Sequence, residues 1–210
     1  MLIQAIKCYE DQNYPNKELV VCFPKNDKAT KEILVSHLHP DGKYIQIERP
    51  DDESLGNARN RAIMKCTGSY ICMWDDDDWY HSSRLSFQFN SMQIVGERFQ
   101  GSVLSRILLY DATKEEAYYS FSYTWDGTIM CRKELLLQNQ YANRNAGEDT
   151  HVITFLSARK LLHKIEDAPF LYVYIYHGEN TWGYDHFQHF LTKSHKLDNH
   201  TTAALIATLS

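Results

Sequence analysis

Short apolar segments alternate with segments of helical periodicity along the first 80 residues, and this pattern constrains the fold more than any other feature. Runs rich in β-forming residues at 18–23, 44–47 and 70–74 each follow a stretch whose apolar residues recur at helical spacing. The expected helices are 2–12, 28–38 and 55–66. This alternation predicts an α/β protein with a largely parallel sheet, in which ligands bind beyond the carboxyl ends of the strands.

The second half of the chain mixes strands and helices less regularly. Two strand-like runs, 101–110 and 117–123, are expected to form a hairpin around 111–116. Further strands are expected at 127–131 and 170–176, and helices at 82–95, at 149–160 and from 185 onward. The first half therefore has the clearer α/β pattern.

Four adjacent carboxylates, Asp75 to Asp78, follow the apolar run 70–73 and stand between Trp74 and Trp79. Crowded carboxylates repel one another, which raises their pKa values, and a divalent cation relieves the repulsion. Mg²⁺ and Mn²⁺ prefer oxygen ligands, and Mg²⁺ is often held by one or two carboxylates together with substrate phosphates. The cluster therefore predicts a metal–phosphate site, with a solvated acidic turn as the alternative.

Composition narrows the class of partner. The 22 basic and 27 acidic residues give a net charge of −5, which argues against a nucleic-acid binder. No segment has the roughly 18 consecutive apolar residues of a membrane span, and the N-terminus lacks the apolar core of a signal peptide. The five scattered cysteines form no Cys-x-x-Cys pair. We expect a cytoplasmic protein without a transmembrane segment; peripheral contact with the inner face of the membrane stays open.

Several motifs occur along the chain in a definite order. They are Gly-Asn-Ala-Arg-Asn at 56–60, Gly-Ser-Tyr-Ile at 68–71 before the Asp cluster, Arg-Leu at 84–85, Gly-Glu-Asp at 147–149 and His-Gly-Glu-Asn-Thr at 177–181. In this order they resemble family 2 glycosyltransferases. The resemblance implies a GT-A-type fold, a three-layer α/β/α arrangement with a mainly parallel mixed sheet.

The same resemblance implies how the chain is divided. A single GT-A-like domain would occupy residues 1–210. Its nucleotide-sugar half would be roughly 1–100, its acceptor half 101–185 and its C-terminal helical tail 186–210.

Donor and metal roles follow from the resemblance, residue by residue. Asp77 and His177 would bind the metal, and the cofactor would be Mn²⁺ or Mg²⁺. Because the four Asp residues are consecutive, Asp76 and Asp78 remain alternative metal ligands. Arg59 could instead be a surface arginine, and His177 a buried histidine bonded to backbone. The residues expected at the donor are Arg59, Asn60, Asp75 and Asp76, and Asn60 is also expected to fix the local turn.

Acceptor and catalytic roles fall on two other segments. Asp149 would be the general base that takes the acceptor's proton, and Glu148 would help to anchor the acceptor. The alternative for both is that they serve the N-terminus of the following helix. Trp125 and Asp126 are expected along the acceptor cleft, with core packing as the alternative for Trp125.

The chain departs from the family pattern at two places. The family begins with a strand that helps to cradle the nucleotide base, whereas this sequence starts within the first helix. The family's second strand ends in Asp-Asp-Gly-Ser, whereas 22–27 read Cys-Phe-Pro-Lys-Asn-Asp, so that Asp27 could substitute only if the loop ran differently. A missing central strand exposes a sheet edge, which leads to the expectation of a homodimer formed through that edge.

The leading hypothesis is a metal-dependent, inverting glycosyltransferase of polysaccharide or glycolipid synthesis. Its partners would be a nucleotide-diphosphate sugar and a saccharide or lipid-linked acceptor, with no nucleic acid. The alternative is a truncated, non-catalytic GT-A-fold protein that binds a ligand or partner. A nucleotidyltransferase is disfavoured, because no Gly-rich phosphate loop with basic residues lies near the N-terminus.

Overall fold

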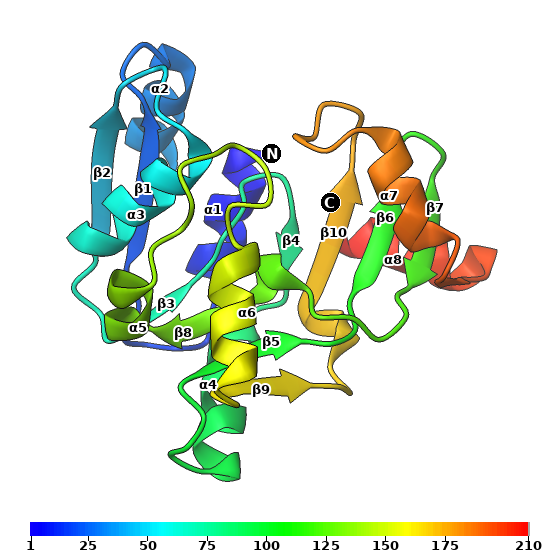
Figure 1. Ribbon diagram of the computed structural model, residues 1–210. Coiled ribbons are helices and arrows are strands. Elements are labelled where there is room, and N and C mark those ends of the chain that lie inside the picture. Colours follow the sequence, from blue (N-terminus) through cyan, green and yellow to red (C-terminus); the bar gives the residue numbers. More distant parts are fainter. Residues whose placement is uncertain (210) are drawn as a thin grey trace.

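The computed structural model describes residues 1–209, and Figure 1 shows its helices and strands. The helices are α1 (Leu2–Glu10), α2 (Lys28–His37), α3 (Leu55–Lys65), α4 (Arg84–Val95), α5 (Lys133–Gln138), α6 (Thr150–Ala158), α7 (Tyr184–Leu191) and α8 (Asn199–Leu209), with single turns η1 (Asp126–Thr128) and η2 (Pro169–Leu171). The strands are β1 (Leu19–Pro24), β2 (Tyr44–Arg49), β3 (Tyr70–Cys72), β4 (Trp79–Tyr80), β5 (Gly101–Leu104), β6 (Leu108–Asp111), β7 (Glu116–Tyr119), β8 (Met130–Arg132), β9 (Leu162–Ile165), β10 (Tyr172–Tyr176) and β11 (His195–Lys196).

The strands form three sheets among the described residues. β1 and β2 pair in parallel, β3-β8-β5-β9 form a second sheet, and β11-β7-β6-β10-β4 form a third. In Figure 1 the β1–β2 pair stands on the left and the β10–β6–β7 group on the right, with the β8–β5–β9 group below and between them. The turn that contains the Asp cluster joins β3 of the second sheet to β4 of the third.

The strand and helix positions expected in the first half are confirmed, with ends shifted by a few residues. The expected strand 101–110 is broken, because its two parts, β5 and β6, belong to different sheets. The tail is two helices separated by β11 rather than one. The α/β class holds. Within residues 1–209, however, only the pairs β1–β2, β5–β9 and β6–β10 are parallel, and antiparallel pairs outnumber them.

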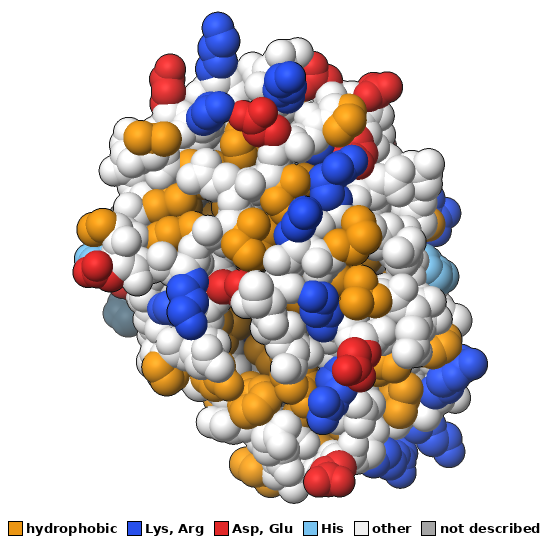
Figure 2. All heavy atoms as spheres, turned by 90° about the vertical axis from the view of Figure 1, so that its left-hand side faces the viewer, with side chains coloured by type: hydrophobic (Ala, Val, Ile, Leu, Met, Phe, Trp, Pro, Cys, Tyr) orange, Lys and Arg blue, Asp and Glu red, His pale blue; other side chains and the backbone are white. Residues whose placement is uncertain are grey.

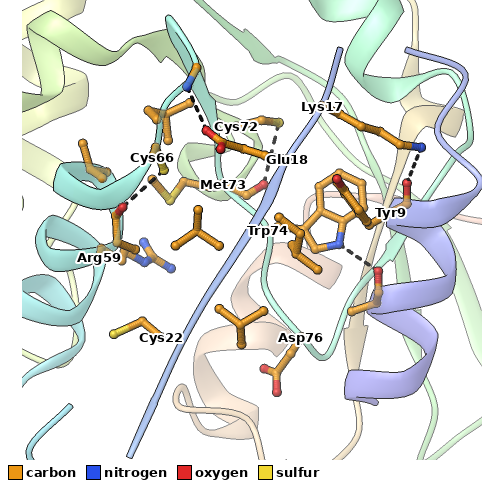
Figure 3. A pocket seen from close by; sticks show the side chains of 18 of the residues that line it. Tyr9, Lys17, Glu18, Cys22, Arg59, Cys66, Cys72, Met73, Trp74 and Asp76 are labelled. Atoms are coloured by element: carbon orange, nitrogen blue, oxygen red, sulfur yellow. Dashed lines mark hydrogen bonds between the residues drawn. The ribbon is translucent and has the colours of Figure 1, made fainter. Parts of the chain in front are cut away.

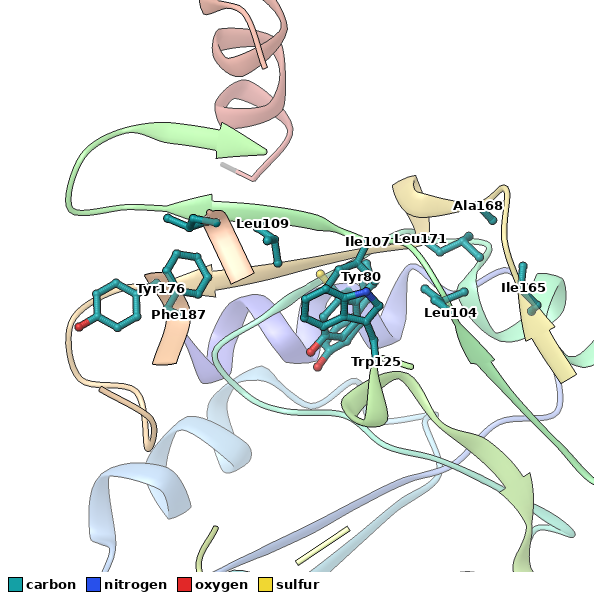
Figure 4. Packing of buried hydrophobic residues seen from close by; sticks show 13 residues of the cluster. Tyr80, Leu104, Ile107, Leu109, Trp125, Ile165, Ala168, Leu171, Tyr176 and Phe187 are labelled. Atoms are coloured by element: carbon teal, nitrogen blue, oxygen red, sulfur yellow. The ribbon is translucent and has the colours of Figure 1, made fainter. Parts of the chain in front are cut away.

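Two large apolar clusters hold the sheets against their helices. One surrounds Tyr80 and Trp125 and includes Leu104, Ile107 and Leu171, so it links the second sheet to the third (Figure 4). The other packs residues of α3, α5 and α6 against β3, β5 and β8. Burial of this much apolar surface is the main stabilising term for such an arrangement, and it fixes α3 and α6 beside the end of β3.

The start of α3 is shaped by two local features. Ser54 caps the helix by accepting a hydrogen bond from the Asn57 backbone N–H at 3.3 Å. At Gly56 a Cβ atom would lie 1.8 Å from the carbonyl oxygen of Ala142. A side chain at Gly56 is therefore excluded, and its absence lets α3 approach the loop that carries Glu148.

Within residues 1–209 there is no helix with the length and apolar character needed to cross a membrane.

Candidate functional site

Arg59 links two carboxylates that lie far apart in the sequence. Its Nη2 lies 2.9 Å from Asp75 Oδ1, and its Nη1 lies 2.5 Å from Glu148 Oε1. The side chains of Arg59 and Glu148 are only 13% and 5% exposed. Burial disfavours the charged guanidinium, but Asp75 and Glu148 raise the pKa of Arg59 overall. This burial argues against the surface-arginine alternative, while donor binding by Arg59 stays a prediction.

Asp77 faces the end of β10 rather than α3. His177 Nε2 lies 3.3 Å from Asp77 Oδ2, and Asn180 Nδ2 donates to the same oxygen at 3.2 Å. Asn180 also donates to the Ile175 carbonyl at 2.9 Å, while its Oδ1 accepts the His177 backbone N–H at 2.9 Å. Burial, followed by the charge of Asp75, raises the pKa of Asp77. Asp77 and His177, both predicted metal ligands, are therefore neighbours.

The other two carboxylates of the cluster point in different directions. Asp78 is buried, accepts the Ile175 backbone N–H at 2.9 Å and accepts the hydroxyl of Tyr172. Burial, followed by Asp77, raises the pKa of Asp78 far above its ordinary value. Asp78 therefore anchors the turn to β10 and is no longer a good alternative metal ligand. Asp76 is exposed and lines the cavity between β1 and β3 (Figure 3).

A buried arginine supports the turn from below. Arg84 is fully buried, and its guanidinium lies over the rings of Trp74, Tyr80 and Tyr172 at 5.2, 4.6 and 5.3 Å. Such cation–π contacts are strongest when water is excluded. The Tyr80 hydroxyl accepts the Asp75 backbone N–H at 2.7 Å. These contacts fix the backbone from which the Asp cluster projects.

Asp149 stands at the N-terminus of α6 without using its side chain there. It occupies the N-cap position, but its carboxylate makes no capping hydrogen bond. The helix-capping alternative for this residue is therefore not realised through its side chain. Glu148, next to it, is buried, and burial raises its pKa although Arg59 opposes the effect.

Asp126 is electrostatically coupled to the Glu148–Asp149 segment. Burial, followed by the charge of Asp149, raises the pKa of Asp126 to about 7, although Lys164 opposes the rise. Trp125, its neighbour, is only 6% exposed, and its ring centroid lies 4.9 Å from that of Phe190. Core packing, the alternative left open for Trp125, accounts for this burial, and no face of its ring is free for a sugar.

Comparison with known proteins decides the family. A model described as "Glycosyl transferase family 2" matches residues 1–161. The chain belongs to glycosyl transferase family 2. The amylovoran biosynthesis glycosyltransferase AmsB of Erwinia amylovora is 27% identical over 111 residues, which are 52% of this chain and 36% of AmsB. The putative teichuronic acid biosynthesis glycosyltransferase TuaG of Bacillus subtilis is 24% identical over 82 residues, 39% of this chain and 32% of TuaG. The matches thus span about a third of each relative.

Solved structures show that this family 2 chain has the GT-A fold. The mannosyltransferase PcManGT of Pyrobaculum calidifontis, in complex with GDP-Man and Mn²⁺, superposes with a TM-score of 0.63 at 15% identity, over 91% of this chain and 58% of that one. S. aureus TarS 1-349 in complex with UDP-GlcNAc gives 0.62 at 16% identity, over 83% and 54%. At these identities the likeness is one of fold.

A divalent cation fits the family 2 site in part. Asp77 and His177 provide one carboxylate and one imidazole, and Mg²⁺ or Mn²⁺ is often held by few protein ligands together with substrate phosphates. Within the part of the chain that is described, no group of three or more His, Cys, Asp or Glu side chains is arranged to hold a metal by itself. The donor set therefore suits a cation that arrives with a diphosphate.

Asn60 holds the neighbouring loop in place. It was predicted at the donor, but it is buried, its Nδ2 donates to the Tyr141 carbonyl at 2.8 Å and its Oδ1 accepts the Tyr141 N–H at 2.9 Å. Because both ends of the amide are occupied, Asn60 holds the loop that leads to Glu148 instead of contacting a ligand.

Sequence reasoning gave no role to three residues that shape the site, Asn180, Arg84 and Tyr172. Asn180 lies within the motif that contains His177, so its place there was an available signal. Arg84 follows the Asp cluster closely, but nothing in the sequence indicates that a charged residue would be fully buried. Tyr172 carries no signal, since its role depends on β10 pairing with β4.

Proposed function

We propose that this chain transfers a sugar from a nucleotide-diphosphate sugar to a hydroxyl group of a saccharide or lipid-linked acceptor. The observation that carries the proposal is the position of Arg59, clamped between Asp75 and Glu148, in the same constellation as the Asp77–His177 pair. Family membership and the GT-A fold support it. Relatives named for amylovoran and teichuronic acid biosynthesis support a place in polysaccharide synthesis.

The donor half of the site would bind the diphosphate. Arg59 lies near the start of α3, where the helix dipole favours anions. The first backbone N–H groups of this helix are already hydrogen-bonded within the chain, so the guanidinium rather than the backbone would contact the phosphates. Asp75 keeps the guanidinium oriented, and Asp75 and Asp76 would contact the ribose or sugar. Asp77 and His177 would hold Mn²⁺ or Mg²⁺, which when bound neutralises charge on the departing diphosphate.

The acceptor half would carry out the proton transfer. Asp149 accepts the proton of the acceptor hydroxyl while that oxygen forms a bond to the anomeric carbon. The bond from the anomeric carbon to the diphosphate oxygen breaks on the opposite face, and its electron pair leaves with the diphosphate. One displacement inverts the anomeric centre. Glu148, engaged with Arg59, couples this half to the donor half.

Asp126 suits acceptor binding better than proton abstraction. Because its pKa is raised to about 7, a large share of its carboxyl groups keep their proton at neutral pH. A protonated carboxyl group donates one hydrogen bond and accepts another. Asp126 would therefore orient an acceptor hydroxyl toward Asp149.

A non-catalytic binding protein is the second candidate, and one observation favours it. The end of β1 offers no free carboxylate for a nucleotide base, since Asp27 caps α2 by accepting from the Thr30 N–H at 3.0 Å and the Thr30 hydroxyl at 2.7 Å. Asp27 therefore does not replace the missing base contact. A chain of this kind would bind a nucleotide or partner without turnover.

Calorimetry and a transfer assay separate the two candidates. UDP, GDP and dTDP are titrated with and without Mn²⁺ into the wild type, Asp77→Ala and the control Asp41→Ala, whose side chain is 91% exposed. We expect metal-dependent binding that Asp77→Ala removes and Asp41→Ala keeps. Asp149→Asn should bind the nucleotide normally but lose about 10²–10⁴-fold in transfer rate. If the chain binds a nucleotide but neither hydrolyses nor transfers the donor sugar, the second candidate is favoured. If no nucleotide binds, the donor site proposed for both candidates is contradicted.

The cytoplasmic location and the peripheral contact with a membrane expected from the sequence remain part of this proposal. A homodimer remains part of it too, although not one formed through the expected edge, because the free edge of β1 faces β3 rather than the outside. Size-exclusion chromatography with light scattering tests the dimer, and flotation with anionic lipid vesicles tests the membrane contact.

A further inference from the structure

A cavity of about 710 Å³ separates β1 from β3. It is lined by the whole of β1 and by residues 69–76, which include β3. Figure 3 shows α3 and α1 on opposite sides of β1, with Arg59 and Tyr9 projecting from them. Figure 2, which views the molecule from the β1–β2 side, shows apolar side chains grouped on a hollowed surface. Protein interiors are normally close-packed, so a void of this size between two strands needs an explanation.

The backbone register shows which groups of β1 face the cavity. The N–H groups of Leu19 and Lys25 donate to β2 and its flanking residue at 2.9 Å, so the odd-numbered residues of β1 bond to β2. In a parallel pair the alternate residues point their N–H and C=O groups the other way. Val20 and Cys22, together with the carbonyl of Pro24, therefore face β3 across the cavity.

The register of β3 is complementary. The Met73 N–H donates to the Ile129 carbonyl at 3.0 Å, and Ile71 is opposite Cys131, so the odd-numbered residues of β3 bond to β8. Tyr70 and Cys72 consequently turn their backbone groups toward β1. Within residues 1–209, β1 and β3 do not pair with each other. Two strand edges thus face each other with no strand between them.

The two edges also run in the same direction. Glu18, directly before β1, accepts hydrogen bonds from the backbone N–H groups of Thr67 and Gly68, directly before β3, at 2.5 and 2.8 Å. A side chain, not backbone pairing, therefore joins the starts of the two strands. At the other end the cavity reaches Asp76 (Figure 3). A single strand between them would be parallel to both.

The lining of the cavity is mainly apolar on both faces, with Arg59 entering from α3 and with Glu18 and Asp76 at its ends. Leu2, Ala5 and Ile6 approach from α1, and Ala58 and Ile63 approach from α3. The residues of β1 from Leu19 to Cys22 are apolar but only half-buried. Strands that are covered by helices on both faces are continuously hydrophobic. The occupant that satisfies this lining and both backbone edges is an extended apolar peptide.

We propose that the slot between β1 and β3 binds one extended, apolar peptide strand that residues 1–210 do not provide, in parallel pairing with both edges. Strand addition to an exposed edge is a general mode of peptide recognition, in which main-chain hydrogen bonds give affinity and side-chain pockets give specificity. A folded second copy does not fit, because the two edges face each other across the slot and only a single strand can enter between them. The bound strand ends beside Asp75 and Asp76, so on the proposed function it would complete the floor of the donor site.

Hydrogen exchange of individual amides tests the proposal without any nucleotide. The probe is a synthetic peptide with five consecutive β-branched residues and polar ends. The same peptide with proline at two alternate positions is the control, since proline cannot donate to a ladder. The slot-facing amides of Val20, Cys22, Tyr70 and Cys72 should exchange at least about tenfold more slowly with the first peptide and unchanged with the second.

The β2-facing amides of Leu19, Val21 and Phe23 serve as the internal reference and should change little. Weak affinity could hide binding of the free peptide. The same peptide sequence is therefore also fused ahead of Met1 through a flexible linker, which raises its effective concentration to about millimolar. Protection of the slot-facing amides in either format supports the proposal. The proposal is overturned if neither format protects the slot-facing amides. It is also overturned if these amides are already as protected in the free chain as the reference amides, or if protection appears only when the protein dimerises.

Discussion

The two sides of the acidic motif are held in opposite ways. On the side of α3 and β10, charged side chains interlock: Arg59 bridges Asp75 and Glu148, and His177 contacts Asp77. On the side of β1, Glu18 at the start of the strand is the one side chain in the described part of the chain that hydrogen-bonds across the gap to the residues before β3. The acidic motif therefore takes its shape from contacts that do not involve β1. A site of this kind keeps its geometry although the sheet beside it is interrupted.

Removing the guanidinium should disrupt the interlocked side most strongly. Arg59→Met leaves Asp75 and Glu148 close together without a counter-charge, and breaking a buried ion pair in this way costs about 3–5 kcal/mol. Urea unfolding followed by tryptophan fluorescence measures the loss. The matched control is Arg61→Met, two residues along the same helix, whose pair with Glu53 is more exposed at 39% for the arginine side chain. Equal losses in the two variants would show that the Arg59 clamp is an ordinary surface pair.

A single methyl group on α3 should weaken the same side to a smaller extent. In Gly56→Ala the new Cβ would meet the Ala142 carbonyl, which is backbone and must move. Overpacking of this kind costs about 1–3 kcal/mol. Gly68→Ala is the control, because its nearest neighbours would lie at an ordinary 3.6 Å. Thermal unfolding monitored by circular dichroism measures both variants, and a stable Gly56→Ala protein would contradict the close approach of α3 to the loop.

The pKa of Asp126 should make stability depend on pH. Its pKa is about 7 in the folded chain and near 3.8 without the fold, so the folded state holds the proton more tightly. The free energy of unfolding should therefore fall as the pH rises from about 4 to about 7. The upper limit of the total fall is about 1.4 kcal/mol for each unit by which the folded and unfolded pKa values of Asp126 differ. Because the side chain is partly exposed, we expect a total of about 1–2 kcal/mol.

Asp126→Asn should remove this fall, while Asp167→Asn, an exposed control, should keep it. Urea unfolding at a series of pH values provides the measurement. If both variants lose stability with pH as steeply as the wild type, Asp126 is not the group responsible.

The side of the acidic motif formed by α3 and β10 could be predicted from local sequence. The alternation of strands and helices predicted α3 and β3, and the resemblance to family 2 glycosyltransferases placed Arg59, Asp75, Asp77 and His177 at one site. The partner of Asn60 could not be predicted, since its amide bonds to Tyr141, which is 81 residues away in the sequence. Contacts over that separation depend on packing that residue type and spacing do not encode.

The slot between β1 and β3 could be predicted from the sequence only in part. The sequence indicated that a strand is missing, but an exposed outer edge was the expected consequence. Instead the β1–β2 pair stays apart from β3, held by α1, α3 and Glu18, so the unpaired groups face inward. Whether a sheet closes over a missing strand or keeps its place open depends on helix packing at both faces, which the pattern of the strands alone does not specify.

The smallest change tests how much the slot side depends on one carboxylate. Burial tends to raise the pKa of Glu18, but hydrogen bonds from Gly68 and Thr67 outweigh it and lower the pKa below 4.5. The stabilisation is therefore present above pH 4.5 and is lost as the pH falls through the pKa of the folded state. Glu18→Gln should cost about 1 kcal/mol at pH 7, less than a buried charged hydrogen bond because the group is partly exposed.

The difference between Glu18→Gln and the wild type should vanish in acid, where both carry a neutral side chain. Urea unfolding at pH 7 and below pH 4 measures it, with Glu32→Gln on the exposed face of α2 as the control. In the same variant the amides of Thr67 and Gly68 should exchange faster, because their acceptor is weaker. A Glu18→Gln protein as stable as the wild type at pH 7 would mean that α1 and α3 alone keep β1 in its place, and the slot would then be a property of helix packing rather than of its closed end.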